Sequence, residues 1–349
     1  MSTPVVNDLY AWMKSTADKF PVAQTEPTPV PAATATSLPG TMTPEDLTIF
    51  DILRLLPPVD LYQEYGIKHN ELSLYPKPLK SQICLVNADT RKWSPEEHKK
   101  DLNSMDVLHW GYLNHYTYAQ IHGYTFKHIQ APKQPGLHST WVKIKELYRM
   151  TLRPECRFTI MLDGDTVFQD LRVPMEALLS HWNITSDITL AGGVDIDRSV
   201  DDRGRLQLNT GFVVTQKTPV LDSLMLDWID CPTDVKYRNC SKWKENWSHE
   251  QAALSNYIRY DPEYRSSIRE LPVEEVHLGG FIKHYWDREK PKLVRASKDA
   301  ILNRFLPGIY RELLGDWNRI HERPTLRMYG AMMRGHRPEK AKGGSVRRG

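Results

Sequence analysis

Short apolar runs alternate with segments of helical periodicity from Gln82 to Tyr260, and this alternation constrains the fold more than any other feature. Such runs have the length of buried strands, and the segments between them repeat apolar residues every three or four positions. We expect strands at 83–86, 124–129, 157–162, 188–191 and 207–215, and helices at 104–122, 141–150, 174–182, 219–229 and 248–260. This order predicts an α/β fold with a mostly parallel sheet flanked by helices on both faces.

Composition divides the chain into four predicted parts. Residues 1–45 are rich in Pro, Thr and Ala, which predicts a disordered segment or linker. Residues 46–80 open with apolar residues at helical spacing before Pro57-Pro58, and we expect a stem or a packing extension. Residues 81–325 hold the alternating pattern and predict a single catalytic domain. Residues 326–349 predict a basic C-terminal tail.

The net charge argues against a nucleic-acid partner. The formal charge is +3, and the excess of basic residues lies in the last stretch of the chain rather than in the predicted catalytic domain. With 349 residues the chain is long enough to bury a large α/β core. The protein is therefore expected to act on small molecules or on other macromolecules, without binding nucleic acid.

The compartment stays open at the sequence level. No stretch approaches the roughly 20 apolar residues of a membrane span, and the first twenty residues lack the pattern of a signal peptide. Three sequons, at Asn183, Asn239 and Asn246, favour the secretory lumen, whereas the lack of an anchor is consistent with the cytosol. Cys231 and Cys240 flank a polar loop and could form a disulfide, whereas the apolar surroundings of the other two, Cys84 and Cys156, predict buried thiols.

The strand at 157–162 runs directly into Asp163-Gly164-Asp165. Two carboxylates so close repel each other unless a cation lies between them or one is protonated. A divalent ion that prefers oxygen ligands, Mn²⁺ or Mg²⁺, is the natural partner. A plain acidic turn after a strand is the simpler alternative. In an open α/β sheet, ligands bind beyond the carboxyl ends of the strands, where this motif falls.

Several stretches together resemble the retaining glycosyltransferases of the GT-A fold, whose hallmark is a D-x-D motif after an apolar strand. Leu208-Asn209-Thr210-Gly211 looks like their N-x-G strand, and Glu250-Gln251 looks like their acidic-Gln helix start. His277-x-x-Gly280-x-x-Lys283 resembles the H-x-x-G-x-x-K pattern of glycogenin-type enzymes. Upstream, Ala119-x-x-His122-Gly123-Tyr124 and Trp141-x-Lys143 look like fungal galactosyl- and mannosyltransferases and plant xylosyltransferases. The resemblance covers Gln82 to Trp286 and implies a Rossmann-like GT-A domain.

The resemblance also implies a metal and donor site. His277 would join Asp163 and Asp165 as the third metal ligand, with His284 as a rival. An imidazole among the ligands favours Mn²⁺ over Mg²⁺. Lys283 would contact the donor diphosphate as a mobile positive charge, and Gly280 would let the backbone approach it. Lys143 would bind the donor, although a solvated helix residue is the simpler interpretation.

The remaining implied residues concern catalysis and the acceptor. Gln251, Glu250 and Asn209 would lie near the reacting sugar in a same-face, retaining transfer. Glu250 departs from the more common Asp, which makes its role less secure, and Asn209 could equally serve a turn. Trp286 is the expected acceptor contact. The expected partners are a nucleotide-sugar donor, with UDP-galactose the first choice of hexose donor, and a glycan acceptor.

Two other functions compete with this interpretation. The run Asp163-Gly164-Asp165-Thr166-Val167 also fits the D-x-D-x-[T/V] motif of haloacid-dehalogenase phosphatases, in which the first Asp is the nucleophile. That family also needs paired carboxylates after a second apolar strand, and Asp201-Asp202 follows no such strand. A catalytically silent GT-A scaffold or carbohydrate-binding protein is the second alternative, and a preserved set of metal-binding residues argues against it.

Overall fold

The computed structural model describes residues 47–54, 59–93, 104–196, 199–298 and 306–335. Contacts divide the chain into two units, Met1–Leu47 and Thr48–Gly349, and every element below belongs to the second. The predicted linker at 1–45 lies outside the described residues, as do the last fourteen residues of the predicted tail, 336–349.

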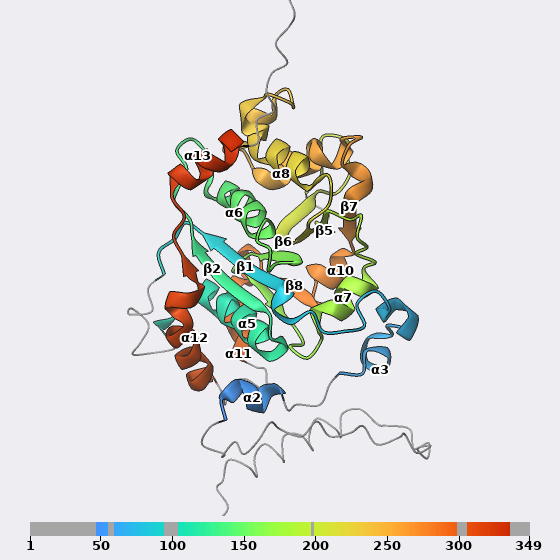
Figure 1. The fold of residues 1–349 in the computed structure, drawn as a ribbon, viewed down its shortest axis with the longest axis vertical. Coiled ribbons are helices and arrows are strands. Elements are labelled where there is room, and N and C mark those ends of the chain that lie inside the picture. Colours follow the sequence, from blue (N-terminus) through green and yellow to red (C-terminus); the bar gives the residue numbers. More distant parts are fainter. Residues whose placement is uncertain (1–46, 55–58, 94–103, 197–198, 299–305, 336–349) are drawn as a thin grey trace, which may run out of the picture. The chain divides into compact units, whose positions relative to one another are not determined.

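A seven-stranded sheet forms the centre of the second unit (Figure 1). The strand order is β7-β5-β6-β3-β1-β2-β9. Strand β6 runs antiparallel to both neighbours, β3 and β5, and the other neighbouring pairs are parallel. The predicted mostly parallel sheet is confirmed. The strands are β1 (Ile83–Asp89), β2 (Thr125–Gln130), β3 (Phe158–Leu162), β5 (Leu190–Val194), β6 (Leu208–Gln216), β7 (Ile268–Leu271) and β9 (His321–Glu322).

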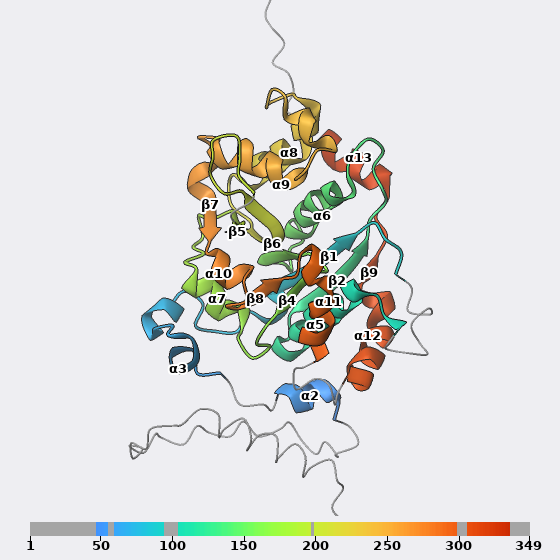
Figure 2. The same ribbon diagram turned by 180° about the vertical axis from the view of Figure 1, so that it is seen from behind.

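Helices cover both faces of this sheet, and alternate residues of β1 show why (Figure 2). Ile83 and Leu85 point into one apolar cluster, which α5, α7 and α12 complete, whereas Cys84 and Val86 point into a second cluster with α6, α8 and α9. A strand packed on both faces is apolar throughout because successive side chains point to opposite sides. The helices are α2 (Ile49–Arg54), α3 (Leu61–Tyr65), α5 (Val107–His122), α6 (Val142–Thr151), α7 (Met175–His181), α8 (Leu221–Asp230), α9 (Glu250–Asn256), α10 (Val273–Val276), α11 (Lys290–Lys298), α12 (Leu306–Ile320) and α13 (Leu326–Gly335).

The long helix α5 shows how the sequence sets its own limits. The Asp106 side chain accepts a hydrogen bond from Leu108 N at the N-terminus, and Gly123 closes the C-terminus in the left-handed region with φ of 74°. Both are the residue types that such caps favour. The prediction that Gly123 stops this helix is confirmed. The helix predicted at 248–260 is shorter in the structure than expected. Helix α9 ends at Asn256, and residues 258–260 form a 3₁₀ turn.

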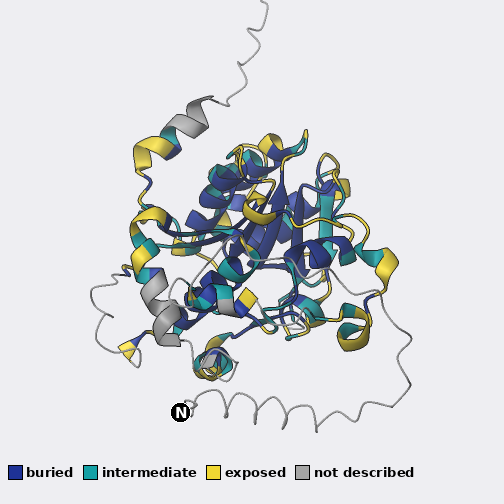
Figure 3. Cartoon of the chain, turned by 60° about the horizontal axis from the view of Figure 1, so that its bottom comes forward, coloured by how far each residue is buried: buried dark blue, intermediate teal, exposed yellow. Residues whose placement is uncertain are grey.

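The flanking segments pack against the sheet domain. Phe50 and Leu53 of α2 are buried in the same cluster as α5, so the segment after residue 46 contributes to the core. Helix α13 occupies the start of the predicted tail, and its Tyr329 is buried and donates a hydrogen bond to Glu146 of α6. Figure 3 shows the strands as a buried layer between the helices.

The four cysteines form two disulfides. Cys231 is bonded to Cys240, as the polar loop between them predicts. Cys84 is bonded to Cys156 with a Cα–Cα distance of 5.6 Å, so the expectation of two buried free thiols is wrong. Cys84 lies on β1 and Cys156 just before β3, and the parallel pairing of these strands brings the two thiols together. None of the helices that the structure describes is both long and apolar enough to span a bilayer.

A small second sheet is the part of the fold that shapes the site. Strand β4 (Thr166–Phe168) pairs antiparallel with β8 (Ile282–His284), and Thr166 is the register partner of His284. Because β4 begins one residue after Asp165, this pairing brings the end of β8 to the carboxyl end of β3. Residues more than a hundred positions apart therefore meet at one edge of the main sheet.

Candidate active site

A cavity of about 360 Å³ opens at the carboxyl ends of β1 and β3. The prediction that Asp163 lies at this edge of the sheet is confirmed. The cavity is lined by residues that follow the two strands, by the start of α6 and by the start of α11, among them Asp89, Thr140, Lys143, Asp163, Asp165 and Lys290. The lining therefore combines carboxylates with lysines.

Asp163, Asp165 and His284 form the group best suited to a metal ion. Each offers one ligand atom, and the three atoms lie within 4.8 Å of one another. Nε2 of His284 is 3.0 Å from Oδ1 of Asp165, and Tyr285 N donates to the Asp165 carbonyl at 2.8 Å. Two carboxylates and an imidazole are a donor set that suits Mn²⁺ and other divalent transition metals. The residues present thus fit the predicted cofactor.

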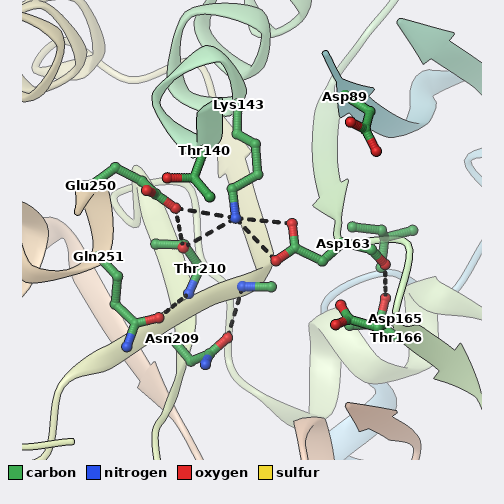
Figure 4. A network of polar contacts seen from close by, with 12 residues as sticks. Asp89, Thr140, Lys143, Asp163, Asp165, Thr166, Asn209, Thr210, Glu250 and Gln251 are labelled. Atoms are coloured by element: carbon green, nitrogen blue, oxygen red, sulfur yellow. Dashed lines mark hydrogen bonds and ion pairs between the residues drawn. The ribbon is translucent and has the colours of Figure 1, made fainter. Parts of the chain in front are cut away.

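Lys143 joins Asp163 to the buried carboxylate of Glu250, which lies behind the cavity lining (Figure 4). Its Nζ lies 2.9 and 3.0 Å from the two carboxylate oxygens of Asp163 and 3.1 Å from Oε1 of Glu250. The Thr210 hydroxyl completes the contact by donating to the same Glu250 oxygen at 2.9 Å. Only 6 % of Lys143 is exposed, so this is a buried ion network rather than a solvated helix residue.

The charges in this network hold one another in place. Burial alone would lower the pKa of Lys143, but the carboxylates of Asp163 and Glu250 raise it above its ordinary value. Burial would raise the pKa of Glu250, and Lys143 outweighs this and lowers it. Asp163 differs, because burial together with the charge of Asp165 raises its pKa despite Lys143. A cation bound beside Asp163 and Asp165 would oppose both of these effects.

Asp165 has two cationic or potentially cationic neighbours of its own. Burial would raise its pKa, but His284 and Lys290 lower it well below the ordinary value. Nζ of Lys290 lies 3.3 Å from Oδ2 of Asp165. Asp165 is therefore ionised and ready to bind a metal ion at neutral pH.

A second, buried polar network surrounds Gln251 behind the cavity lining. Its amide oxygen accepts from Thr210 N at 3.3 Å, and its amide nitrogen donates to Oδ2 of Asp195 at 2.7 Å. Asn209 donates to the same Asp195 oxygen at 3.3 Å and accepts from Gly211 N at 2.8 Å. The predicted catalytic residues are thus brought together, and Glu250 lies beside them as the first residue of α9.

The structure does not bring His277 to the metal group. Its ring is fully buried, with no hydrogen-bonding partner for either nitrogen, and it packs against Gly193 and Val276. Burial lowers the pKa of His277 to about 3. The group contains His284 in its place, the rival considered from the sequence.

Lys283 and Gly280 also lie away from the cavity lining. Lys283 directly precedes His284 on β8, so the two side chains point to opposite faces of the strand. Nζ of Lys283 lies 3.4 Å from Oε2 of Glu289. A Cβ on Gly280 would meet the α10 backbone, 2.9 Å from the Glu274 carbonyl oxygen. Gly280 thus allows two backbone segments to approach each other, and its predicted contact with phosphates has no support from its position.

The predicted spacing recurs seven residues later, at His284, Asp287 and Lys290. His284 and Lys290 both contact Asp165. Asp287 stands where the pattern has glycine, and its φ of 43° lies in the left-handed region that glycine adopts most readily. The pattern favoured His277 to Lys283 because this stretch contains the expected glycine, Gly280. The stretch from His284 to Lys290 contacts the site, but it was harder to recognise because Asp287 stands in place of the glycine.

Two further residues of the site, Asp195 and Asp89, were not predicted from the sequence. Asp195 is a buried carboxylate after β5, and nothing in its sequence neighbourhood marks it as a partner of Gln251. Asp89 ends β1 and accepts hydrogen bonds from Tyr112 at 2.7 Å and from Arg91. Asp89 could have been predicted as a site residue, because it is a polar residue at the end of a buried strand next to the strand of Asp163.

Trp286 follows the predicted ligand segment and is half-buried. Its ring packs against His284 with a centroid distance of 4.5 Å and against His277 at 5.6 Å. The side chain thus supports the imidazole that faces Asp165. Its predicted contact with the acceptor stays a prediction.

Comparison with known proteins places this geometry in a family. Residues 92–308 match the sequence profile of the galactosyl transferase GMA12/MNN10 family, well over half of the chain. No curated protein gives a significant match.

Three solved structures are similar at low identity. A glycosyltransferase involved in the glycosylation of the major capsid of PBCV-1 is 13% identical, with a TM-score of 0.43 over 62% of this chain and 99% of that one. The glycosyltransferase GlyE of Streptococcus pneumoniae is 13% identical, with a TM-score of 0.38 over 65% and 64%. The 4-diphosphocytidyl-2C-methyl-D-erythritol synthase of Anaerococcus prevotii is 10% identical, with a TM-score of 0.32 over 65% and 100%. By its profile match, the chain belongs to the galactosyl transferase GMA12/MNN10 family of glycosyltransferases.

Proposed function

We propose that this glycosyltransferase is metal-dependent and moves a hexose, galactose as the first choice, from a nucleoside-diphosphate sugar to a glycan hydroxyl with retention at the anomeric carbon. The observation that carries the proposal is the group of Asp163, Asp165 and His284 at the cavity of a chain from this family. A divalent cation binds well to the diphosphate of a sugar nucleotide, and this group offers the ligands for one.

Mn²⁺ is the ion that the donor set favours, with Mg²⁺ as the alternative. Carboxylate oxygens serve both ions, but an imidazole nitrogen at His284 favours the softer Mn²⁺. The bound ion would act as a Lewis acid for the charge that grows on the departing diphosphate. His284 is the third ligand that we propose, instead of His277, because it is the histidine that lies with both aspartates in this group.

Lys290 is the lysine that we propose for the diphosphate, instead of Lys283. Its Nζ lies 3.3 Å from Asp165, and its side chain lines the cavity and is half exposed, so it can move to a ligand. A flexible ammonium group is a suitable partner for phosphate oxygens whose charge changes during the reaction. Lys143 is fixed by Asp163 and Glu250, and we propose that it holds these two carboxylates in place beside the donor sugar.

Gln251, Glu250 and Asn209 are the residues that we propose near the reacting sugar, and Glu250 is linked to the cavity lining through Lys143. Glu250 is held by Lys143 and Thr210, and Gln251 is held by Asp195 and Thr210 N. Such fixed groups orient a substrate without reorganisation during the reaction. A neutral amide at Gln251 supports a same-face mechanism over a strong enzymic nucleophile.

The competing functions differ in what they predict for the same residues. A haloacid-dehalogenase phosphatase needs a lysine later in the chain beside its nucleophilic aspartate, whereas the lysine on Asp163 here, Lys143, precedes it. A silent scaffold has no need for a histidine that reaches Asp165 across 119 positions. The family match favours a transferase over both.

A donor panel tests the proposal. The purified chain is incubated with Mn²⁺, Mg²⁺ or EDTA and with UDP- and GDP-hexoses, and nucleoside diphosphate release is measured. We expect Mn²⁺-dependent release, lost in Asp165→Asn and kept in Asp187→Asn, an exposed aspartate away from the cavity. NMR of the product then gives the anomeric configuration. Release of phosphate from phosphomonoesters without donor turnover would overturn the assignment.

A further inference from the structure

Trp247 is a tryptophan that the folded domain leaves largely uncovered. It is 78% exposed, and the other tryptophans among the described residues are buried or half-buried. An exposed aromatic ring of this size is unusual on a protein surface that binds nothing. Its position relative to the active-site cavity indicates what this ring binds.

Two stacked imidazoles connect Trp247 to the cavity. The Trp247 ring meets the ring of His249 at a centroid distance of 5.8 Å, and His249 stacks on His138 at 3.6 Å with an interplanar angle of 7°. His138 lines the cavity. The three rings therefore form a continuous chain of aromatic contacts, called here the aromatic platform, from the exposed Trp247 through the buried His249 to the cavity wall.

The aromatic platform is held rigidly. His138 N donates to the Lys244 carbonyl at 2.8 Å, and His249 N donates to the Asn246 carbonyl at 2.8 Å. Trp141 Nε1 adds a bond to the Trp243 carbonyl at 3.1 Å. The segment that carries Trp247 is thus bonded to the turn just before α6, and this turn and α6 supply Thr140 and Lys143 to the site.

The aromatic platform also lies on the reacting side of the site. His249 directly precedes Glu250 and Gln251, the first two residues of α9. The metal group lies on the other side of Lys143, which contacts Asp163 (Figure 4), and Lys290 lies against Asp165. With the diphosphate at the metal group, the His138 side of the cavity is where an acceptor hydroxyl can approach the sugar.

We propose that the exposed end of the aromatic platform binds the acceptor glycan, and that Trp247 stacks on a sugar unit beyond the one that receives the transferred hexose. This deepens the proposed function and rests on it. The flat C–H face of a pyranose packs well on an indole ring, whereas its hydroxyl groups stay in water. Because two imidazoles separate Trp247 from the cavity, a single sugar in the cavity would not reach it.

Chain length is the test. Wild-type protein, Trp247→Ala, Trp247→Phe and the control Val235→Ala are assayed with mannose, galactose and glucose oligosaccharides of increasing length. Val235 is exposed in the same half of the domain, at 83%. We expect Trp247→Ala to raise KM for the longer acceptors about tenfold, the loss of one aromatic contact. KM for monosaccharides and hydrolysis of the donor by water should not change, and Trp247→Phe should retain most of the affinity.

Two outcomes would overturn the proposal. One is an unchanged KM for every acceptor length in Trp247→Ala. The other is a loss of donor hydrolysis as large as the loss of activity on the longer acceptors, which would mean that Trp247 only supports Glu250 and Gln251.

Saturation-transfer NMR with the same oligosaccharides separates this proposal from the proposed function. Signal transfer to the sugar in wild type and its loss in Trp247→Ala would support the aromatic platform even without turnover. Equal transfer in both proteins would overturn it. If the wild type turns over no sugar nucleotide, the proposed function fails on the donor panel alone, and the NMR result still decides whether Trp247 binds glycans.

Discussion

Gly211 of β6 lies directly against the imidazole of His284. A Cβ on Gly211 would fall 2.2 Å from Cε1 and 2.7 Å from Nδ1 of that ring. No side-chain atom fits in that space, so glycine is required for His284 to reach Asp165. The glycine of the Asn209-Thr210-Gly211 stretch thus serves the metal group through a residue 73 positions later in the chain.

Gly211→Ala should therefore damage the metal group without touching a ligand. The added methyl pushes the His284 ring away from Asp165, and misplaced ligand support costs about 10–100-fold in metal affinity or activity. Mn²⁺ titration of donor turnover measures the effect. Gly192→Ala is the matched control on the neighbouring strand, because its nearest contact is an ordinary 3.7 Å. Equal Mn²⁺ affinity in the two variants would contradict the role of Gly211.

Lys290 and Lys283 give a second paired comparison. Lys290 contacts Asp165 and lines the cavity, whereas Lys283 pairs with Glu289. Lys290→Ala should raise KM for the sugar nucleotide by about 10–100-fold, as expected for one charge-assisted hydrogen bond to phosphate. Lys283→Ala should change it less than about threefold, because exposed ion pairs contribute little. Steady-state kinetics over donor concentration at saturating Mn²⁺ decide between them, and the reverse ranking would restore Lys283.

The contrast between these two lysines shows what the sequence could predict. Asp163-Gly164-Asp165 was recognisable because its chemistry is contained in three adjacent residues at the end of an apolar strand. The third ligand was not, because His277 and His284 stand at equivalent points of the same spacing. The choice between them depends on the pairing of β4 with β8, which a short strand of three residues scarcely signals.

The fold was more accessible than the site. Buried strands such as β3 are apolar throughout, and helices such as α5 carry their own caps, so local sequence determines them. The Cys84–Cys156 disulfide joins residues 72 positions apart, and only the register of β1 on β3 reveals it. Contacts of this kind are set by tertiary packing and leave no local pattern.

Asp195 offers a test of positioning. Its carboxylate accepts from the amide of Gln251 at 2.7 Å and from Asn209 at 3.3 Å. Asp195→Asn replaces the accepting carboxylate with an amide that faces the amides of Gln251 and Asn209, and it releases Gln251. We therefore expect kcat to fall about tenfold, which corresponds to the loss of one hydrogen bond. Donor KM and Mn²⁺ affinity should stay near wild type, because the metal group is untouched. A variant that loses Mn²⁺ affinity together with kcat would instead indicate a general structural role.

Lys143 should make stability depend on the metal. Without it, Asp163, Asp165 and Glu250 share the site with no fixed cation between them, and breaking a buried ion pair costs about 3–5 kcal/mol. Lys143→Met should melt at a lower temperature in EDTA, and Mn²⁺ should restore more of its stability than it adds to wild type. Differential scanning fluorimetry measures both. The control is Lys145→Met, which removes a lysine of the same helix that bonds to Gln134. The absence of any Mn²⁺ stabilisation in wild type and variant would contradict the metal group.

His181 should make stability depend on pH at a point far from the active site. Its two ring nitrogens lie 3.0 Å from Glu71 and 3.1 Å from Glu275. The hydrogen bond with Glu275, followed by that with Glu71, raises the pKa of His181. A raised folded-state pKa means that the stabilisation is complete below the ordinary value of about 6.5 and is lost as pH rises through the folded-state pKa.

Urea unfolding between pH 5.5 and 8.5 should therefore show this contribution decreasing with pH, by about 0.5–1 kcal/mol because the pair is partly solvated. His181→Gln should be less stable than wild type at the acidic end and equal to it at the basic end. His69→Gln, which changes an exposed histidine two residues before Glu71, should follow the wild-type curve. A constant difference between His181→Gln and wild type at every pH would show that the ring stabilises the fold by packing rather than by charge.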